Sequence, residues 1–413
     1  MVVDRDNALG LYVSIPFCRS KCTYCNFASG VYPASEHNRY VDRLIQDLSA
    51  SGKWASRMGV ALPHRVDTVY LGGGTPSLLA PDLLARLFTS MRSEFEFDPD
   101  AEITVECAPG QVADDTLAAL AAVGVNRVSL GVQSFIDREA QSSGRLHSRA
   151  IVAEDLRRLR AAGIANLNVD LIAGLPGQTL ASWRESLDIL LDSGVPHASV
   201  YMLEVDEDSR LGREMLAGGA RYDAELVPSD DAIARMYGEA IEQLARAGLP
   251  QYEISNFSQP GFASRHNLRY WHRRPYLGLG LDASSMLRAR IDETGPQYGL
   301  RSTTTDNLAA FLSGSEMVET AWLSLASQHE EAWFLGLRLN AGVDMEALES
   351  EFGHSTVALA RRVLPRLQAA GLLSVAGKFV RLTAQGQLLS NEVFQEFLGL
   401  TPDAEFARPA VET

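Results

Sequence analysis

Hydrophobic positions alternate between two spacings along the first half of the chain. Short runs rich in β-branched residues, such as VDTVYL and NLNVDLI, are followed by longer runs with apolar residues every three or four positions. The first pattern is typical of buried strands and the second of amphipathic helices. We expect strands at 11–15, 68–71, 102–106, 127–130, 168–172 and 198–203, and helices at 40–49, 81–94, 115–123, 150–161 and 180–191.

These repeated strand–helix units predict a parallel sheet with helices outside it. Periodicity alone fits both an open doubly wound sheet and a partial (β/α)6 barrel. The polar residues favour the barrel, because three cysteines, a glycine run, Glu106, Gln133 and Asp170 all lie at or just past strand ends. A barrel gathers such ends around one mouth. We therefore predict an α/β protein with a TIM-like partial (β/α)6 barrel.

The rest of the chain predicts a second, smaller unit. A helix at 230–247 and a strand at 252–254 come before an aromatic, loop-rich segment at 256–300. Three helices, a two-stranded hairpin and a last helix then resemble a winged helix; they are expected at 328–337, 345–351, 357–369, 372–375, 379–382 and 384–398. The predicted divisions are a barrel at 1–255, a connecting region at 256–325, a winged-helix-like unit at 326–400 and a disordered tail at 401–413.

Charge and composition narrow the choice of partners and compartment. The chain of 413 residues has a formal net charge of −15, which argues against nucleic acid or an anionic membrane as its main partner. The opening MVVDRDNALG lacks the apolar core of a secretory signal, and no run of about 18 uncharged apolar residues predicts a membrane span. Four cysteines without an export signal favour the reducing cytoplasm.

Three of these cysteines carry the strongest chemical signal. Cys18, Cys22 and Cys25 stand in a C-x3-C-x2-C spacing just after the first predicted strand. Three thiolates on one loop can hold three irons of a 4Fe–4S cluster and leave the fourth iron open to a small molecule. A structural zinc site wants four ligands, and a disulfide with a spare thiol would suit a secreted protein. We predict a cluster with an open iron.

A glycine run one strand–helix unit later adds a second signal. Gly73, Gly74 and Thr75 stand in GGGTP directly after a strand, where glycines let backbone approach a ligand. This run is neither the dinucleotide fingerprint nor a phosphate loop. Together with YVSIPFC, CRSKCTYCNF, GVQSF, DLIAGLPGQT and HNLRYW, it resembles the radical S-adenosylmethionine (SAM) superfamily. Within that superfamily the chain resembles the oxygen-independent coproporphyrinogen III oxidase family.

The resemblance implies a set of cofactor contacts. SAM would chelate the open iron, and one electron from the cluster would cleave a C–S bond of the sulfonium. Carboxylates and a guanidinium suit this cofactor, because they can pair with its amino, ribose and carboxylate groups. The implied SAM-binding positions are Tyr12, Gly73, Gly74, Thr75, Glu106, Gln133, Arg145 and Asp170.

Two substitutions point to one branch of that family. Phe27 stands where the oxidases have a fourth cysteine, and Ser14 stands where they have a histidine. Asn26-Phe27 after the third cysteine instead resembles the HemW branch, whose members are regarded as heme-binding chaperones. The H-N-x-x-Y motif of that branch is present from His266 to Tyr270. It implies that His266 ligates heme iron and that Tyr270 lies on the same helical face.

Two main functions therefore compete. The first is a chaperone that binds a 4Fe–4S cluster, SAM and heme, takes an electron from a donor and passes heme to an acceptor protein. The alternative is an enzyme that decarboxylates coproporphyrinogen III or otherwise modifies a tetrapyrrole, and the sequence leaves open whether the chain is an enzyme. A third reading gives the cluster only a supporting role in the fold.

Two further positions depart from the pattern of the family. Ser284 replaces a histidine after YLGLG, and Cys107 stands where the family has asparagine. We predict that Cys107 is a small buried residue rather than a ligand.

Overall fold

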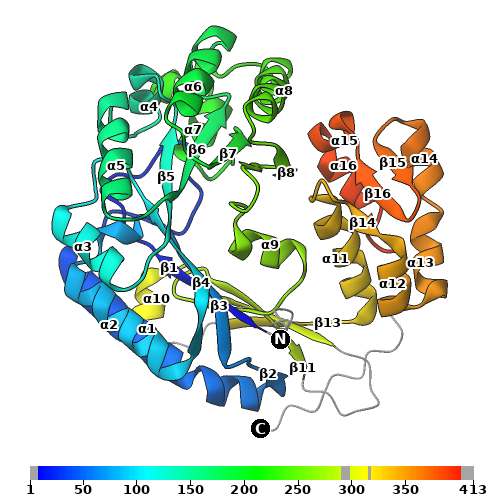
Figure 1. Ribbon diagram of the computed structural model, residues 1–413, viewed down its shortest axis with the longest axis horizontal. Helices are drawn as coiled ribbons and strands as arrows, with labels where there is room; N and C mark the ends of the chain where they lie inside the picture. The colour runs from blue at the N-terminus through cyan, green and yellow to red at the C-terminus, as the bar shows by residue number, and fades with distance from the viewer. Residues whose placement is uncertain (1–7, 290–297, 315–317, 401–413) are drawn as a thin grey trace.

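The computed structural model describes residues 8–289, 298–314 and 318–400. Six adjacent parallel strands form the centre of its main sheet: β1 (Leu9–Ile15), β3 (Arg65–Gly73), β4 (Glu96–Cys107), β5 (Arg127–Gln133), β6 (Asn166–Ala173) and β7 (His197–Met202). The helices between them lie on the outside of the curved sheet (Figure 1): α1 (Ala34–Arg57), α2 (Pro81–Glu94), α3 (Asp114–Ala122), α5 (Arg149–Ala161) and α6 (Leu180–Asp192). The predicted alternation of strand and helix is confirmed.

Alternate residues of each strand face opposite sides of this sheet. In β1, which reads LGLYVSI, the apolar side chains at Leu9, Leu11, Val13 and Ile15 are fully buried in the main hydrophobic core. Tyr12 occupies the other parity, and its ring stacks on that of its register partner Tyr70 at 6.2 Å between centroids. The helices therefore cover the apolar side, and the other side is left for polar and aromatic residues.

The main sheet is longer than the sequence predicted. Beyond β1, β10 (Tyr276–Leu279) pairs in parallel, and antiparallel strands β11 (Ser284–Ala289), β12 (Gly299–Thr304) and β13 (Val318–Leu323) follow. Beyond β7 lie β9 (Asn256–Ser258) and β8 (Gln251–Glu253). The expectation of a loop-rich segment at 256–300 was therefore wrong, because these strands are too short to show a clear period. The strand order runs from β13 to β8 without closing, as in a partial barrel.

A second hydrophobic core organises the C-terminal part. Trp333 stacks on Phe397 at 4.7 Å within this core. The elements around it are α11 (Leu325–Leu337), β14 (Val343–Asp344), α12 (Met345–Phe352), α13 (His354–Arg361), α14 (Leu364–Ala369), β15 (Leu373–Ala376), β16 (Phe379–Leu382), α15 (Ala384–Leu388) and α16 (Ser390–Gln395). The single helix predicted at 357–369 is two helices, because Pro365 lies in the first turn of α14 and cannot continue the preceding helix. The helix predicted at 384–398 is also divided, at Leu389.

Contacts near helix α9 (Arg265–Trp271) join the C-terminal part to the barrel. The guanidinium of Arg273 pairs with the carboxylate of Glu351 at 2.6 Å, and Arg338 stacks over Trp271 at 4.4 Å. Figure 1 shows the C-terminal elements, in orange and red, on the side of α9 away from α1 and α2. Within the described ranges, no helix has both the length and the apolar character that crossing a membrane requires.

Candidate functional site

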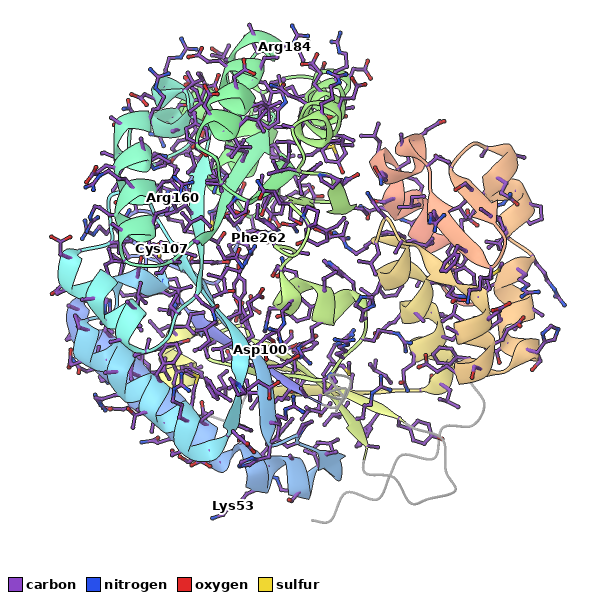
Figure 2. The ribbon with its side chains drawn as sticks, in the orientation of Figure 1. Lys53, Asp100, Cys107, Arg160, Arg184 and Phe262 are labelled. Carbon is purple, nitrogen blue, oxygen red and sulfur yellow. The ribbon has the colours of Figure 1, made fainter. Side chains whose placement is uncertain are left out.

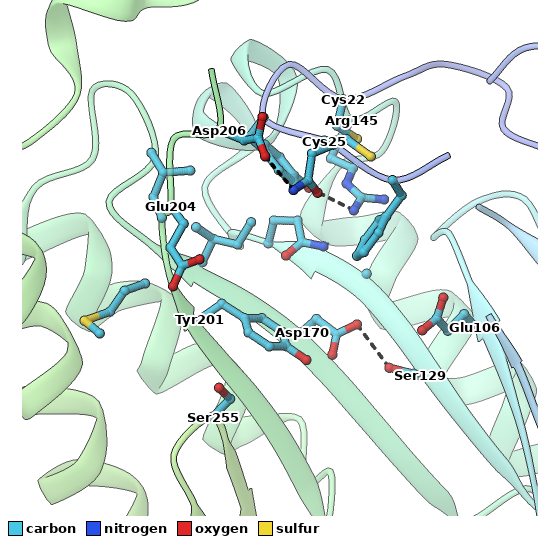
Figure 3. Close-up of a pocket in the computed structure, with 18 of the residues that line it drawn as sticks. Cys22, Cys25, Glu106, Ser129, Arg145, Asp170, Tyr201, Glu204, Asp206 and Ser255 are labelled. Atoms are coloured by element: carbon cyan, nitrogen blue, oxygen red, sulfur yellow. Dashed lines mark hydrogen bonds between the residues drawn. The ribbon is translucent and has the colours of Figure 1, made fainter. Parts of the chain in front are cut away.

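A cavity of about 970 Å³ lies where the parallel strands of the barrel end. Figure 3 shows Cys22, Cys25 and Arg145 on one side of it and Glu106 and Asp170 on another. The predicted site residues that line it are Cys18, Cys22, Cys25, Gly73, Gly74, Thr75, Glu106, Gln133, Arg145 and Asp170. Residues 120 positions apart in the sequence thus share one cavity.

Backbone hydrogen bonds hold the cysteine loop in place. The Cys18 amide donates to the Gly30 carbonyl at 2.9 Å, and the Thr23 amide donates to the Ser143 carbonyl at 3.0 Å. Gly144 packs so closely that a Cβ there would lie 3.2 Å from Cα of Cys22. All three cysteines of the loop are partly buried and have free thiols. The loop therefore presents three thiols from a fixed backbone.

This donor set suits a cluster better than a single ion. In the described part of the chain, no three His, Cys, Asp or Glu side chains converge closely enough to hold one metal ion. In a cubane cluster each cysteine binds a different iron, so such convergence is not needed. Burial raises the pKa of the Cys18 thiol, and a bound metal reverses this effect by stabilising the thiolate.

The glycine run lies against the start of the cysteine loop. The Gly74 amide donates to the Ile15 carbonyl and the Thr75 amide to the Phe17 carbonyl, both at 2.8 Å. A Cβ on Gly74 would lie 2.8 Å from both of these carbonyl oxygens. Gly73 has φ of 101°, a conformation that favours glycine. Only glycine therefore lets this turn approach the loop so closely.

Glu106 connects the glycine run to the aromatic side of the barrel. Its carboxylate accepts hydrogen bonds from the Tyr70 hydroxyl at 2.8 Å and from the Gly73 amide at 3.2 Å. Burial is the main cause that raises the pKa of Glu106 to about 7, and the nearby charge of Asp170 adds to it. The carboxyl group thus changes its charge near neutral pH.

Among the described residues that line the cavity, several have a buried polar atom without a hydrogen-bond partner, and Arg145 and Gln133 are two of them. Arg145 donates to the Tyr24 hydroxyl at 3.0 Å, but its Nε atom makes no hydrogen bond, and neither does Oε1 of Gln133. Gln133 also has φ of 70°, which is strained for a residue other than glycine. Buried polar atoms normally find partners, so these unpartnered atoms are evidence that the cavity is suited to bind a polar ligand.

Asp170 is held in position by its neighbours on the sheet. The Ser129 hydroxyl donates to one carboxylate oxygen at 3.0 Å (Figure 3), and the Asn168 side-chain amide donates to the other at 2.7 Å. Burial raises the pKa of Asp170. SAM carries both hydrogen-bond donors and acceptors. The cavity offers matching groups: two carboxylates, a guanidinium, a side-chain amide and the backbone of the glycine run. The residues present therefore fit this cofactor.

The H-N-x-x-Y motif lies outside this cavity, on α9. The ring of His266 is 1% exposed. Its Nδ1 lies 2.9 Å from the Thr68 hydroxyl, and its Nε2 lies 2.9 Å from the Tyr270 hydroxyl. Burial is the main cause that lowers the pKa of His266 to about 3, so the ring is neutral. The predicted proximity of His266 and Tyr270 is present, but both ring nitrogens already have partners. A heme-ligand role for His266 therefore stays a prediction that requires Nε2 to exchange its partner.

The same helix is attached to two strands by buried polar contacts. Glu102 of β4 accepts hydrogen bonds from the amides of Arg265 and His266, at 3.1 and 3.0 Å. Arg269 forms an ion pair with Asp67 of β3, and both side chains are at most 3% exposed. Tyr12 is near this helix, with its ring 6.4 Å from that of His266. The motif thus has a clear structural role in addition to any role toward heme.

Sequence reasoning missed two tyrosines and correctly placed one cysteine. Tyr70 donates a hydrogen bond to Glu106, and Tyr24 accepts one from Arg145. Tyr70 faces the same side of the sheet as Tyr12, and Tyr24 lies inside the cysteine motif. These two positions are the sequence signals that could have shown them. Cys107 is 4% exposed within the barrel (Figure 2), and burial raises the pKa of its thiol to about 12. Its predicted role as a small buried residue is confirmed.

The two serines that replace family histidines have ordinary structural surroundings. The Ser14 carbonyl accepts a hydrogen bond from Tyr40 at 2.7 Å, and the side chain is 6% exposed. Ser284 lies in β11, and its hydroxyl is 3.0 Å from that of Thr303 on β12.

Comparisons with known proteins agree with this geometry. Residues 12–190 match the radical SAM superfamily, and residues 323–389 match the HemN C-terminal domain. The heme chaperone HemW of Lactococcus lactis is 33% identical over 389 residues, which cover 94% of this chain and 96% of the relative. The chain belongs to the HemW family of radical SAM proteins. The Escherichia coli heme chaperone HemW is 30% identical and covers 94% of this chain and 98% of its own length.

A solved structure supports the assignment of the fold. Coproporphyrinogen III oxidase (HemN) from Escherichia coli, a radical SAM enzyme, superimposes with a TM-score of 0.79 at 23% identity. The match covers 95% of this chain and 91% of that protein. It confirms the predicted partial barrel with a small C-terminal unit.

Proposed function

We propose that this protein is a radical SAM heme chaperone that binds a 4Fe–4S cluster, SAM and heme and passes the heme to an acceptor protein. One observation carries the proposal. A chain 33% identical to a heme chaperone over 94% of its length has one cavity that brings together the three cysteines of the loop and unpartnered polar atoms of Gln133 and Arg145. The free thiols support a cytoplasmic location, where thiols stay reduced.

The residues of the cavity divide the binding task. Cys18, Cys22 and Cys25 would hold the cluster, and Gly73, Gly74 and Thr75 would receive the amino acid part of SAM. Glu106, Gln133, Arg145 and Asp170 would contact its charged and polar groups, and Tyr12 would flank the site from the aromatic side. With both cofactors bound, a reduced cluster would supply the electron for cleavage of the SAM sulfonium.

The pKa of Glu106 gives the SAM site an expected pH dependence. Below about pH 7 the carboxyl group is neutral, and above it the carboxylate can attract the positive sulfonium of SAM and accept a hydrogen bond from its amino group. We expect SAM to bind about tenfold more tightly at pH 8 than at pH 6, the ratio of the ionised fractions. Titration of the reconstituted protein by calorimetry checks this.

A matched variant shows whether the pH dependence of SAM binding comes from Glu106 or from another titrating group. Glu106→Gln keeps the size of the side chain and removes its charge, so its SAM affinity should be lower and nearly the same at both pH values. An equally strong pH dependence in this variant would show that another group controls binding.

Heme binding through α9 has its own test. His266→Ala should weaken heme binding at least about tenfold if the imidazole supplies an axial bond. The same change also removes the His266 partner of the Tyr270 hydroxyl and one of the two side-chain partners of the Thr68 hydroxyl, which also bonds Arg269, at a cost of about 1–3 kcal/mol in stability. Heme titration by absorbance and thermal melting are therefore measured together.

Thr68→Val is the control for this loss of stability. It removes the hydroxyl bonded to Nδ1 and keeps the imidazole, so heme affinity should stay near that of the wild type while the melting temperature falls. If both variants lose heme affinity equally, α9 acts through its packing and His266 is not the ligand.

A tetrapyrrole-modifying enzyme is the second candidate, because every predicted SAM contact except Tyr12 lines the cavity. In that case 5′-deoxyadenosine should form from SAM only when a porphyrinogen is added. Its absence with all porphyrinogens tried, alongside tight heme binding, supports the chaperone.

A further inference from the structure

Large apolar side chains are exposed around the cysteine loop. Four such residues in the described part of the chain are more than 60% exposed: Phe27, Val31, Leu146 and Leu216, at 62, 63, 61 and 69%. Phe27 and Val31 belong to the loop itself, and Phe27 and Leu146 also line the mouth of the cavity. We call these four residues the apolar collar. Exposed apolar residues that gather in one place mark an interaction surface.

Hydrogen bonds bring the segments of the collar together. The Ser20 hydroxyl donates to the Gly144 carbonyl at 3.1 Å, two residues before Leu146. The Leu211 amide of α7 (Arg210–Leu216) donates to the Thr23 carbonyl at 2.8 Å. The loop from 16 to 33, the turn before α5 and helix α7 therefore lie against one another.

The collar residues are held in their exposed positions. The Phe27 carbonyl accepts hydrogen bonds from the Ser29 amide at 2.7 Å and from Nζ of Lys21 at 3.1 Å. Leu146 lies between Arg145, which is bonded to Tyr24, and His147, which is 3% exposed. The backbone at Phe27 and the neighbours of Leu146 are therefore held in place while both side chains are exposed.

The charge of the loop differs from that of the whole protein. Residues 16–33 include Arg19 and Lys21 and no carboxylate, in a chain with net charge −15. The acidic segment at 204–208 lies beside them, because the Asn26 side-chain amide bonds Asp206 at 3.0 Å. A partner with acidic groups around an apolar centre would be attracted to Arg19 and Lys21 and repelled by the acidic segment at 204–208. These opposite effects would fix the orientation of the partner.

The collar and the H-N-x-x-Y motif lie at opposite ends of the strands. His266 contacts Thr68, whereas the cysteine loop contacts the glycine run from Gly73 onward in the same strand. Gly73 lies five positions after Thr68 along β3, a rise of about 17 Å. A partner at the collar therefore approaches the cysteines and not α9, so the collar is suited to a protein that serves the cluster.

We infer that the apolar collar docks an acidic one-electron donor protein that reduces the cluster. The inference rests on the proposed cluster. One electron leaves the donor, which is oxidised, and enters the cluster, which changes from its 2+ to its 1+ state; no bond forms or breaks.

The test compares a protein donor with a small one. The reconstituted protein is reduced anaerobically with a reduced flavodoxin or with dithionite, and loss of cluster absorbance is followed in stopped flow. In the double variant Phe27→Ser, Leu146→Ser, we expect reduction by flavodoxin to slow about tenfold or more, the effect of removing central apolar contacts. Reduction by dithionite should be unchanged. Binding of oxidised flavodoxin, measured by calorimetry, should weaken to a similar extent.

Two further variants make the test specific. Leu398→Ser changes a 50% exposed leucine of the C-terminal unit and should leave both rates unchanged. Arg19→Glu should slow reduction by flavodoxin and reduce its dependence on salt.

Three results would overturn the inference. The first is an equal flavodoxin rate in the wild type and the collar variant. The second is an equal slowing with dithionite. The third is a collar variant that only dissociates an oligomer, which would assign the surface to a second copy of the chain. A protein that takes up no reducible cluster overturns the proposed function as well, so the two failures are distinguishable.

Discussion

Cys22→Ala is expected to abolish the cluster while leaving the barrel folded. Cys18, Cys22 and Cys25 line the cavity from one loop, and a cubane bound by only two of them would have a second open iron. We expect the reconstituted variant to hold less than about a tenth of the wild-type iron and sulfide. Chemical analysis of both elements and the visible absorption spectrum measure this directly.

Cys107→Ala is the matched control for this experiment. Cys107 is 4% exposed and belongs to the main hydrophobic core, so its loss should cost only about 1 kcal/mol in stability. Its iron content should equal that of the wild type. Loss of iron in the Cys107 variant, or full iron in the Cys22 variant, would assign the cluster to other ligands.

Asp67→Asn is expected to give a large loss of stability. Asp67 and Arg269 are 3% and 1% exposed, and their ion pair joins β3 to α9. Neutralising Asp67 leaves the Arg269 guanidinium buried without its countercharge, which typically costs about 3–5 kcal/mol. Urea denaturation should show a lower midpoint, and heme binding through α9 should weaken with it.

Glu36→Gln is the control, because it breaks an exposed ion pair instead of a buried one. Glu36 and Arg39 form an ion pair on α1 in which the side chains are 25% and 61% exposed, so its loss should change stability by less than about 1 kcal/mol. Equal midpoints for the Asp67 and Glu36 variants would mean that the buried pair does not stabilise α9.

The central barrel was predictable because its strands and helices have different hydrophobic periods. Helix α2 was placed with its exact ends, since Pro81 begins it and a polar residue closes its apolar pattern. The outer strands β9 and β10 were not predictable, because they have three and four residues and pair with β7 and β1, which for β10 lies far away in the sequence.

The site was predictable only in part, for a similar reason. Cys18, Cys22 and Cys25 share one short motif, so their spacing alone indicates their chemistry. The surroundings of His266 depend on Thr68, which is 198 residues earlier in the chain, and no local pattern shows that both ring nitrogens find partners. Tertiary hydrogen bonds of this kind decide which polar residues remain available to a ligand.

The central claim is that one iron of the cluster is open and receives SAM. The most direct measurement is electron paramagnetic resonance of the anaerobically reconstituted, reduced protein, recorded with and without SAM. We expect a 4Fe–4S signal whose g values shift when SAM is added, because the cofactor becomes a ligand of the open iron. An unchanged signal at saturating SAM, or a protein that takes up zinc in place of the cluster, would contradict this account.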